Sequence, residues 1–232
     1  MLKRSTLVLT ILALVLLLDQ MLKLWVKTHL SYGEQFSIFG TDWAYIHFVE
    51  NNGMAFGISF GGELGKLALS LFRIAAVVFL GFLIRNLIKQ SATKGLLVCL
   101  SLVMAGAIGN ILDSAFYGLL FSASDYHGGL SQFMGDDGGY APFLHGKVVD
   151  MFYFPIIDTI LPDWFPIWGG QRFEFFKPIF NVADTAISIG IISLLLFQRK
   201  FITHSDNSSN PIQHPVEPEA STNDVDKVDN VE

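Results

Sequence analysis

The sequence predicts an all-α membrane protein, a four-transmembrane-helix bundle with a few short strands outside the bilayer. Of the 232 residues, 51% are apolar and only 16% are charged, and the mean hydropathy is +0.46. The chain also contains four apolar stretches of about 20 residues, the length of helix that crosses roughly 30 Å of hydrocarbon. An ordinary soluble domain is less apolar than this, and a disordered chain is more highly charged.

The four stretches are rich in Leu, Ile, Val, Phe and Ala and show no strand-like alternation, so they are expected to span the membrane as helices. They cover about 5–25, 64–84, 95–115 and 178–198. The first follows two basic residues, as a secretory signal peptide would. Its apolar run is too long for one, however, and Asp19 and Lys23 lie where a cleavage site is expected.

Basic residues near the ends of the spans predict that both termini face the cytoplasm. Two outer segments then remain, about 26–63 and 116–177. The first mixes aromatic and β-branched residues with Gly and Asn, which predicts short strands and turns. The second contains a strand-like stretch at 147–158 and a loop with Trp164 and Trp168, typical of the aromatic belt at a membrane surface.

The negative charge is concentrated at the C-terminal end. Seven of the 21 acids and one of the 15 bases lie from Phe201 onward, so 14 of each remain upstream. We therefore expect a membrane domain over 1–200 and a disordered acidic cytoplasmic tail over 201–232. The neutral body excludes a nucleic-acid binder that relies on a basic surface. The single cysteine, Cys99, excludes a disulfide framework and a multi-thiolate metal site.

Ionisable groups inside the spans cost roughly 2.5–3.5 kcal/mol each at mid-bilayer, so each needs a reason. Asp19 and Lys23 stand four residues apart on one helix face. We expect an ion pair that neutralises itself, lets Lys23 reach the interface, and supports a site without reacting. Arg73, in the second span, is a further candidate for an internal partner.

An N-x-x-D pair occurs in both the third and the fourth span. The pairs are Asn110 with Asp113 and Asn181 with Asp184. The third helix travels outward and the fourth returns inward. Asp113 and Asp184 are therefore expected at the same depth, near the outer surface.

Two carboxylates at that depth allow three interpretations. In close contact they would share one proton near neutrality, so that one activates water while the other polarises a carbonyl, as in aspartic proteases. Alternatively, they hydrogen-bond the helices to one another, or they are ligands in a proton or cation pathway. A Ser–His protease and a zinc protease are excluded, because all six histidines lie outside the spans and H-E-x-x-H is absent.

Five short motifs follow one another along about residues 10–198. They are D-Q-x-x-K at 19–23, N-x-G-x-A-F-G at 51–57, G-N-x-x-D at 109–113, V-V-D at 148–150 and F-N-x-A-D at 180–184. Each motif is weak alone, but their order and their positions relative to the four spans are specific. In these features the chain resembles the bacterial lipoprotein signal peptidases (signal peptidase II).

The resemblance implies an aspartic endopeptidase of the bacterial inner membrane, active near the outer face, with Asp113 and Asp184 as catalytic residues. It would remove signal peptides from prolipoproteins, cutting just before a cysteine that carries a diacylglyceryl group. A small extracytoplasmic β-sheet cradle and a surface helix would close over the substrate. The supporting or substrate-contacting positions would be Asp19, Lys23, Asn51, Gly53, Asn110, Asp150 and Asn181.

The same resemblance implies no metal or organic cofactor. The expected partners are prolipoprotein signal peptides with diacylglyceryl-cysteine and membrane lipid, with no nucleic acid, and the expected state is a monomer. A small proton- or cation-translocating protein that uses the same two aspartates is the alternative, and a scaffold held together by its polar pairs is a third possibility.

Two features depart from the family pattern. The family usually has arginine after G-N-x-x-D, whereas this chain has Ser114, so Arg73 and Arg172 are candidates for the missing cation. The chain between the two catalytic candidates is also longer than usual, with an insertion around 119–146. A larger lid over the site is expected from it.

Overall fold

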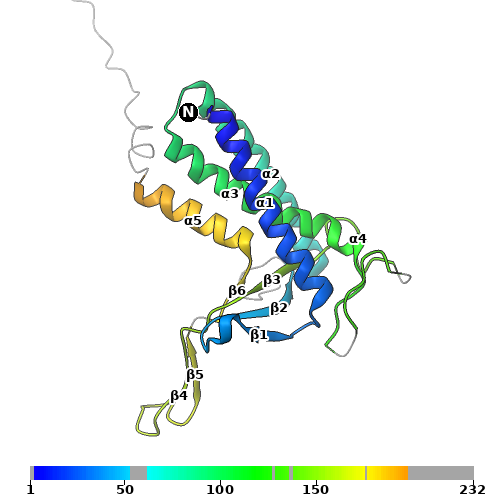
Figure 1. Cartoon of the computed structure of the whole chain (residues 1–232), viewed down its shortest axis with the longest axis vertical. Helices are drawn as coiled ribbons and strands as arrows, with labels where there is room; N and C mark the ends of the chain where they lie inside the picture. The colour runs from blue at the N-terminus through cyan, green and yellow to red at the C-terminus, as the bar shows by residue number, and fades with distance from the viewer. Residues whose placement is uncertain (1–2, 53–61, 127–128, 136–137, 176, 198–232) are drawn as a thin grey trace, which may run out of the picture. The chain divides into compact units, whose positions relative to one another are not determined.

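The computed structural model describes residues 3–52, 62–126, 129–135, 138–175 and 177–197. Long apolar helices and a small antiparallel sheet make up this part of the chain (Figure 1), which confirms the predicted fold class. Gly53 and the acidic tail lie outside the described residues.

Four helices form the apolar part of the molecule. They are α1 (Arg4–His29), α2 (Gly62–Lys89), α3 (Lys94–Leu112) and α5 (Val182–Phe197). The first three are long and apolar enough to cross a membrane, and α5 is a shorter apolar helix of 16 residues. Leu14 and Leu17 of α1 are more than half exposed, as expected for side chains that face lipid.

Helix α3 is the centre of the bundle, because it packs against α1, α2 and α5. Small residues allow the close contact with α5. A Cβ added to Gly106 would lie 2.2 Å from the Ala183 carbonyl oxygen, and one added to Gly190 would lie 2.7 Å from that of Cys99. Small residues at a helix interface let two backbones approach in this way.

The end of α3 is irregular. The α-helix changes at Asp113 into a single π-helical turn, η3 (Asp113–Tyr117), which the short helix α4 (Gly118–Leu120) follows. Turns of this kind inside α-helices occur frequently at functional sites.

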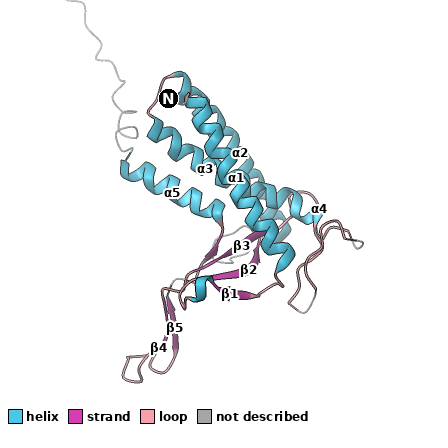
Figure 2. Cartoon of the chain, viewed as in Figure 1, coloured by secondary structure: helices cyan, strands magenta, loops and turns pink. Residues whose placement is uncertain are grey.

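A four-stranded antiparallel sheet lies at the end of the bundle where α5 begins (Figure 2). Its strands are β1 (Gln35–Ser37), β2 (Tyr45–Asn51), β3 (Val148–Tyr153) and β6 (Ile179–Phe180), in the order β1-β2-β3-β6. A 3-10 turn, η1 (Ile38–Gly40), follows β1. The predicted short strands of the first outer segment are therefore confirmed. Of the strand-like stretch at 147–158, Val148–Tyr153 forms β3, whereas residues 154–156 are not in a strand.

A second, two-stranded sheet is a hairpin of β4 (Ile157–Ile160) and β5 (Arg172–Phe175). The loop between these strands carries Trp164 and Trp168, and both side chains are exposed.

The sheet and the bundle share one apolar core. Val26 and Leu30 of α1 meet Phe48, Val149 and Met151 of the sheet, together with Tyr117 and Phe121 from the chain that follows α3. The beginning of the insertion is therefore packed into the structure. Lys27, buried beside this cluster, lies over the rings of Phe121 and Tyr140.

The predicted start of the fourth span at residue 178 is wrong by four residues. Strand β6 comes first and pairs Phe180 with Phe152 of β3. The helix begins only after Asn181, whose side-chain oxygen accepts a hydrogen bond from the Asp184 N–H at 2.9 Å. This is the usual hydrogen bond of a helix N-cap.

Candidate functional site

Polar side chains from four elements meet where α1, α3 and α5 contact strand β3. Each of the following is at most 3% exposed: Asp19 and Lys23 from α1, Asn110 and Asp113 from α3 and its π turn, Asp150 from β3, and Asn181 before α5. Asp184, in the first turn of α5, is half-buried. Burial of such groups without partners is costly, so each of them is expected to have hydrogen-bond or ion-pair partners inside the site.

Lys23 is the central cation of this cluster. Its Nζ lies 2.9 Å from Asp19 Oδ2 and 2.8 Å from Asp113 Oδ2, and it donates a hydrogen bond of 2.9 Å to Asn110 Oδ1. The expected ion pair with Asp19 is therefore present. The expectation that Lys23 reaches the interface is wrong: its side chain is fully buried, because two carboxylates bind it inside the bundle.

Both carboxylate oxygens of Asp113 accept hydrogen bonds. Oδ1 accepts from Gln20 Nε2 at 2.9 Å. Oδ2 accepts from the Val149 N–H at 3.3 Å, in addition to its contact with Lys23. Asp113 is completely buried. It therefore connects α1, the π turn and strand β3.

Asp184 is bound by Asn110 and not by Lys23 directly. Its Oδ1 accepts a hydrogen bond of 2.9 Å from Asn110 Nδ2, and the Oδ1 of Asn110 accepts from Lys23. The connection between Asp113 and Asp184 thus runs through Lys23 and Asn110. The principal charges near Asp113 are those of Lys23 and Asp19, whereas the charge of Asp184 acts on Asp150.

Asp150 is the carboxylate that shares its surroundings with Asp184. Asn181 donates to Asp150 Oδ1 at 2.7 Å and also caps the helix that carries Asp184. Asn51 donates to Asp150 Oδ2 at 3.3 Å. Burial, followed by the negative charge of Asp184, raises the pKa of Asp150 to about 7. Asp150 therefore exchanges its proton near neutral pH.

Several sequence motifs have a geometric explanation here. A Cβ on Gly109 would lie 2.6 Å from Asp19 Oδ2, so only glycine allows α1 this close to α3. The N–H of Ala183 donates to Asp19 Oδ1 at 2.9 Å. Gln20 belongs to the D-Q-x-x-K motif but was not among the expected supporting positions, although its place beside Asp19 in a membrane span was a usable signal.

The two arginine candidates lie in different places. Arg73, on α2, is close enough to Asp184, Asp113 and Asp150 to interact with their charges. Arg172 belongs to the β4–β5 hairpin. Arg73 is therefore a better candidate than Arg172 to replace the arginine that Ser114 does not supply.

A second buried ion pair fastens the insertion to the sheet. Lys27 of α1 is paired with Glu50 of β2, and both are almost completely buried. Ser124, within the insertion, donates to Glu50 Oε1 at 3.0 Å, and Lys147 lies 3.4 Å from Glu50 Oε2. Sequence reasoning missed this pair because its members come from a helix end and an outer strand, with no shared spacing.

No three His, Cys, Asp or Glu side chains are placed to hold a metal ion in the part of the chain that the structure describes. The groups that cluster at the site are carboxylates, amides and one ammonium. They can move protons and polarise a carbonyl, which is general acid–base chemistry.

Fold and site together define a multi-pass membrane protein with a buried carboxylate site at the boundary between helices and sheet. Residues 11–200 match the family described as signal peptidase (SPase) II. A lipoprotein signal peptidase of Porphyromonas gingivalis (strain ATCC 33277) is 50% identical over 196 residues, which cover 84% of each chain. One from Amoebophilus asiaticus is 36% identical over 82% of this chain and 76% of its own.

A solved structure of a bacterial membrane enzyme has the same fold, with a TM-score of 0.52 and 21% identity, covering 89% of this chain and 94% of that one. The chain belongs to the signal peptidase II family. Membership implies a peptidase, here a multi-pass protein of the bacterial inner membrane.

Proposed function

We propose that this protein is an intramembrane aspartic endopeptidase that removes the signal peptide from prolipoproteins, cutting just before a diacylglyceryl-modified cysteine. The names of its relatives support the substrate class. The buried carboxylates, at the boundary between apolar helices and an outer sheet, suit a substrate whose scissile bond lies beside a lipid-modified residue.

Asp150 and Asp184 are the proposed reacting pair. The observation that carries this assignment is the position of Asp150, which accepts hydrogen bonds from two neutral amides and has a pKa of about 7 because it is buried beside Asp184. Two adjacent carboxylates that hold one proton are the arrangement used by aspartic proteases.

The proposed reaction follows from that protonation state. Ionised Asp184 takes a proton from water, and the water oxygen attacks the peptide carbonyl carbon, whose oxygen receives a hydrogen bond from protonated Asp150. The tetrahedral intermediate collapses when the carbon–nitrogen bond breaks, and the leaving nitrogen gains a proton from the pair. The products are the free signal peptide and a lipidated cysteine with a free amine.

Asp113 has a positioning role in this proposal, which revises its assignment as the second catalytic residue. Its oxygens are already bound by Lys23, Gln20 and the Val149 N–H. Through Lys23 it orients Asn110, which holds Asp184. A carboxylate that is ion-paired and fully buried is a poor proton shuttle.

The proposed setting is the inner membrane with both termini in the cytoplasm and the site near the outer face. The proposed partners are prolipoprotein and membrane lipid, and the proposed active form is a monomer.

Three isosteric variants test the assignment: Asp150→Asn, Asp184→Asn and Asp113→Asn. Purified protein would be given a diacylglyceryl-modified precursor peptide, with and without chelator. The first two variants should lose cleavage by at least about a thousandfold, as expected when an acid or base is removed from a concerted pair. The third should be less stable to heat, while its folded fraction still cleaves.

Asp42→Asn, in the exposed turn after η1, is the matched control for loss of one carboxylate and should be fully active. Cleavage by Asp150→Asn at the wild-type rate would refute the pair. Loss of cleavage only in Asp113→Asn and Asp184→Asn would restore the assignment made from the sequence. Inhibition of the wild-type enzyme by chelator would refute the metal-free mechanism.

A further inference from the structure

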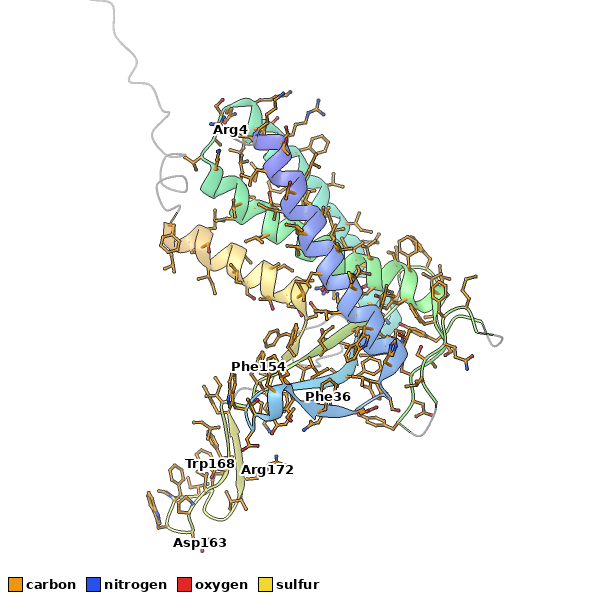
Figure 3. All side chains as sticks on the ribbon, viewed as in Figure 1. Arg4, Phe36, Phe154, Asp163, Trp168 and Arg172 are labelled. Carbon is orange, nitrogen blue, oxygen red and sulfur yellow. The ribbon has the colours of Figure 1, made fainter. Side chains whose placement is uncertain are left out.

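The β4–β5 hairpin exposes more large apolar side chains than a water-facing loop needs. Trp164 is 79% exposed and Ile167 is 86% exposed. Figure 3 shows the hairpin with Asp163, Trp168 and Arg172 labelled. The other large apolar side chains exposed on it are Ile157, Ile160, Trp168, Phe173 and Phe175. So many exposed large apolar side chains on one short hairpin are typical of a contact site.

The tip of the hairpin is ordered, so its exposure is built into the fold. The Gly170 N–H donates to the Leu161 carbonyl at 2.9 Å, and the Gly169 N–H donates to that of Phe165 at 3.1 Å. The rings of Phe165 and Trp168 stack with their centroids 6.5 Å apart. These contacts therefore hold the exposed apolar side chains of the tip in one conformation.

Ile167 has a φ of 70°, in the left-handed region. A β-branched residue is a genuine outlier there, and such strain collects at functional segments. Glycine or asparagine would relieve the strain, but would remove the most exposed apolar side chain of the tip.

An open hollow of about 270 Å³ lies beside the hairpin. It is lined by Leu161, Trp168, Gln171, Arg172, Phe173 and Lys177. Two of these residues are cations, two are aromatic and none is acidic. Arginine and lysine bind phosphate oxygens, and Trp beside a cation is typical of the headgroup level of a bilayer.

We propose that the β4–β5 hairpin is a membrane-surface anchor, in which the tip side chains enter the headgroup layer and the hollow binds a phospholipid phosphate. Chain connectivity supports a lipid occupant. Strand β5 ends at Phe175 and α5 begins at Val182, so only six residues, which let the two ends lie at most about 25 Å apart, connect the hairpin to an apolar helix.

The anchor has a measurable consequence for its two tryptophans. The full-length chain would carry Trp25→Phe and Trp43→Phe, so that fluorescence reports only Trp164 and Trp168. It would be reconstituted into phosphatidylcholine vesicles with acyl chains brominated either near the headgroup or near the chain end. Bromine near the headgroup should reduce the emission at least about twofold and more strongly than bromine at the chain end, because the tip is interfacial.

The hollow is tested by a second variant in the same background. Arg172→Gln with Lys177→Gln should weaken the quenching by brominated lipid and increase quenching by aqueous iodide. Arg85→Gln with Lys89→Gln, two exposed cations at the far end of α2, is the matched control and should leave both signals unchanged. In vesicles of a neutral glycolipid without phosphate, the first pair of substitutions should have no effect.

Emission that is quenched by iodide and by neither brominated lipid would overturn the proposal. Quenching by brominated lipid that requires added precursor peptide would also overturn it, and would make the hairpin a substrate-docking surface. Equal quenching in the double-glutamine variant and in its parent would refute the phosphate site.

Discussion

At the scale of single residues, the site balances four carboxylates against very few cations. Lys23 is ion-paired with both Asp19 and Asp113 in the interior, while Asp150 and Asp184 lie together on the side of the sheet and of the α5 cap. The carboxylates thus divide into an ion-paired set, which supports the structure, and a set that can share a proton. This division supports the proposed assignment of the chemistry to Asp150 and Asp184.

The pKa of Asp150 predicts the alkaline limit of the reaction. In the proposed mechanism Asp150 must be protonated to polarise the carbonyl, so kcat/KM should fall about tenfold per pH unit above its pKa of about 7. A pH series on the lipidated precursor peptide in detergent micelles measures this limit.

Replacing Asn51 by alanine tests whether Asp150 sets the alkaline limit, because the direction of the expected shift is known. The hydrogen bond from Asn51 stabilises the charged form of Asp150 and lowers its pKa. Asn51→Ala should therefore move the alkaline limit to higher pH. A limit that stays in place or moves to lower pH would show that another group controls the profile.

Removing the central cation should be far more damaging than removing a surface one. Lys23→Met leaves Asp19 and Asp113 buried without their partner, which costs about 3–5 kcal/mol. The melting temperature in detergent should fall sharply. Lys89→Met, at the exposed end of α2, is the control and should melt as the wild type does. Equal melting of the two variants would mean that Lys23 does not hold the site together.

At the scale of elements, the contact between α3 and α5 positions Asp184. The helices approach closely at Gly106 and Gly190, and Asn181 ends β6 and caps α5. The four apolar stretches were predictable because hydrophobicity is a local property. The start of α5 could not be predicted in this way. Residues 179–180 are part of the same apolar run, but they pair with β3 as a strand.

A single methyl group should test this contact. Gly106→Ala places a Cβ 2.2 Å from the Ala183 carbonyl oxygen, one residue before Asp184, so α5 must shift and cleavage should fall at least about tenfold. In Gly81→Ala the nearest atom is 3.9 Å away, at the flexible end of Met104, so this variant should retain activity. The protein amount in membranes and the cleavage rate are measured together. Full activity of Gly106→Ala would show that α3 and α5 can move apart without loss of cleavage.

At the scale of the whole molecule, the outer segments form one body with the helices. The core joins α1 to β2 and β3, and the Lys27–Glu50 pair ties the insertion to both. The insertion thus supports the sheet that carries Asp150. Its packing could not be predicted from the sequence, because its buried residues, such as Phe121, follow no helical or strand period.

Cysteine labelling tests the proposed orientation of the whole chain. In a Cys99→Ser background, Asp42→Cys lies in the outer segment and Gln90→Cys lies between α2 and α3. A membrane-impermeant maleimide added to intact spheroplasts should label the first, and should label the second only after lysis, because basic residues concentrate on the cytoplasmic side. The reverse pattern would invert the topology and put the site at the inner face.

The sequence by itself determined the membrane class, the four apolar helices, the short outer strands and the motifs that carry the polar residues. These follow from composition, local hydrophobicity and residue order. Only the tertiary structure decided which carboxylates meet. Spacing along a helix places Asp113 and Asp184 at one depth, but the partner of each carboxylate depends on the register of β3, the cap of α5 and the position of Lys23 between helices. Those contacts join residues far apart in the chain, and no local pattern encodes them.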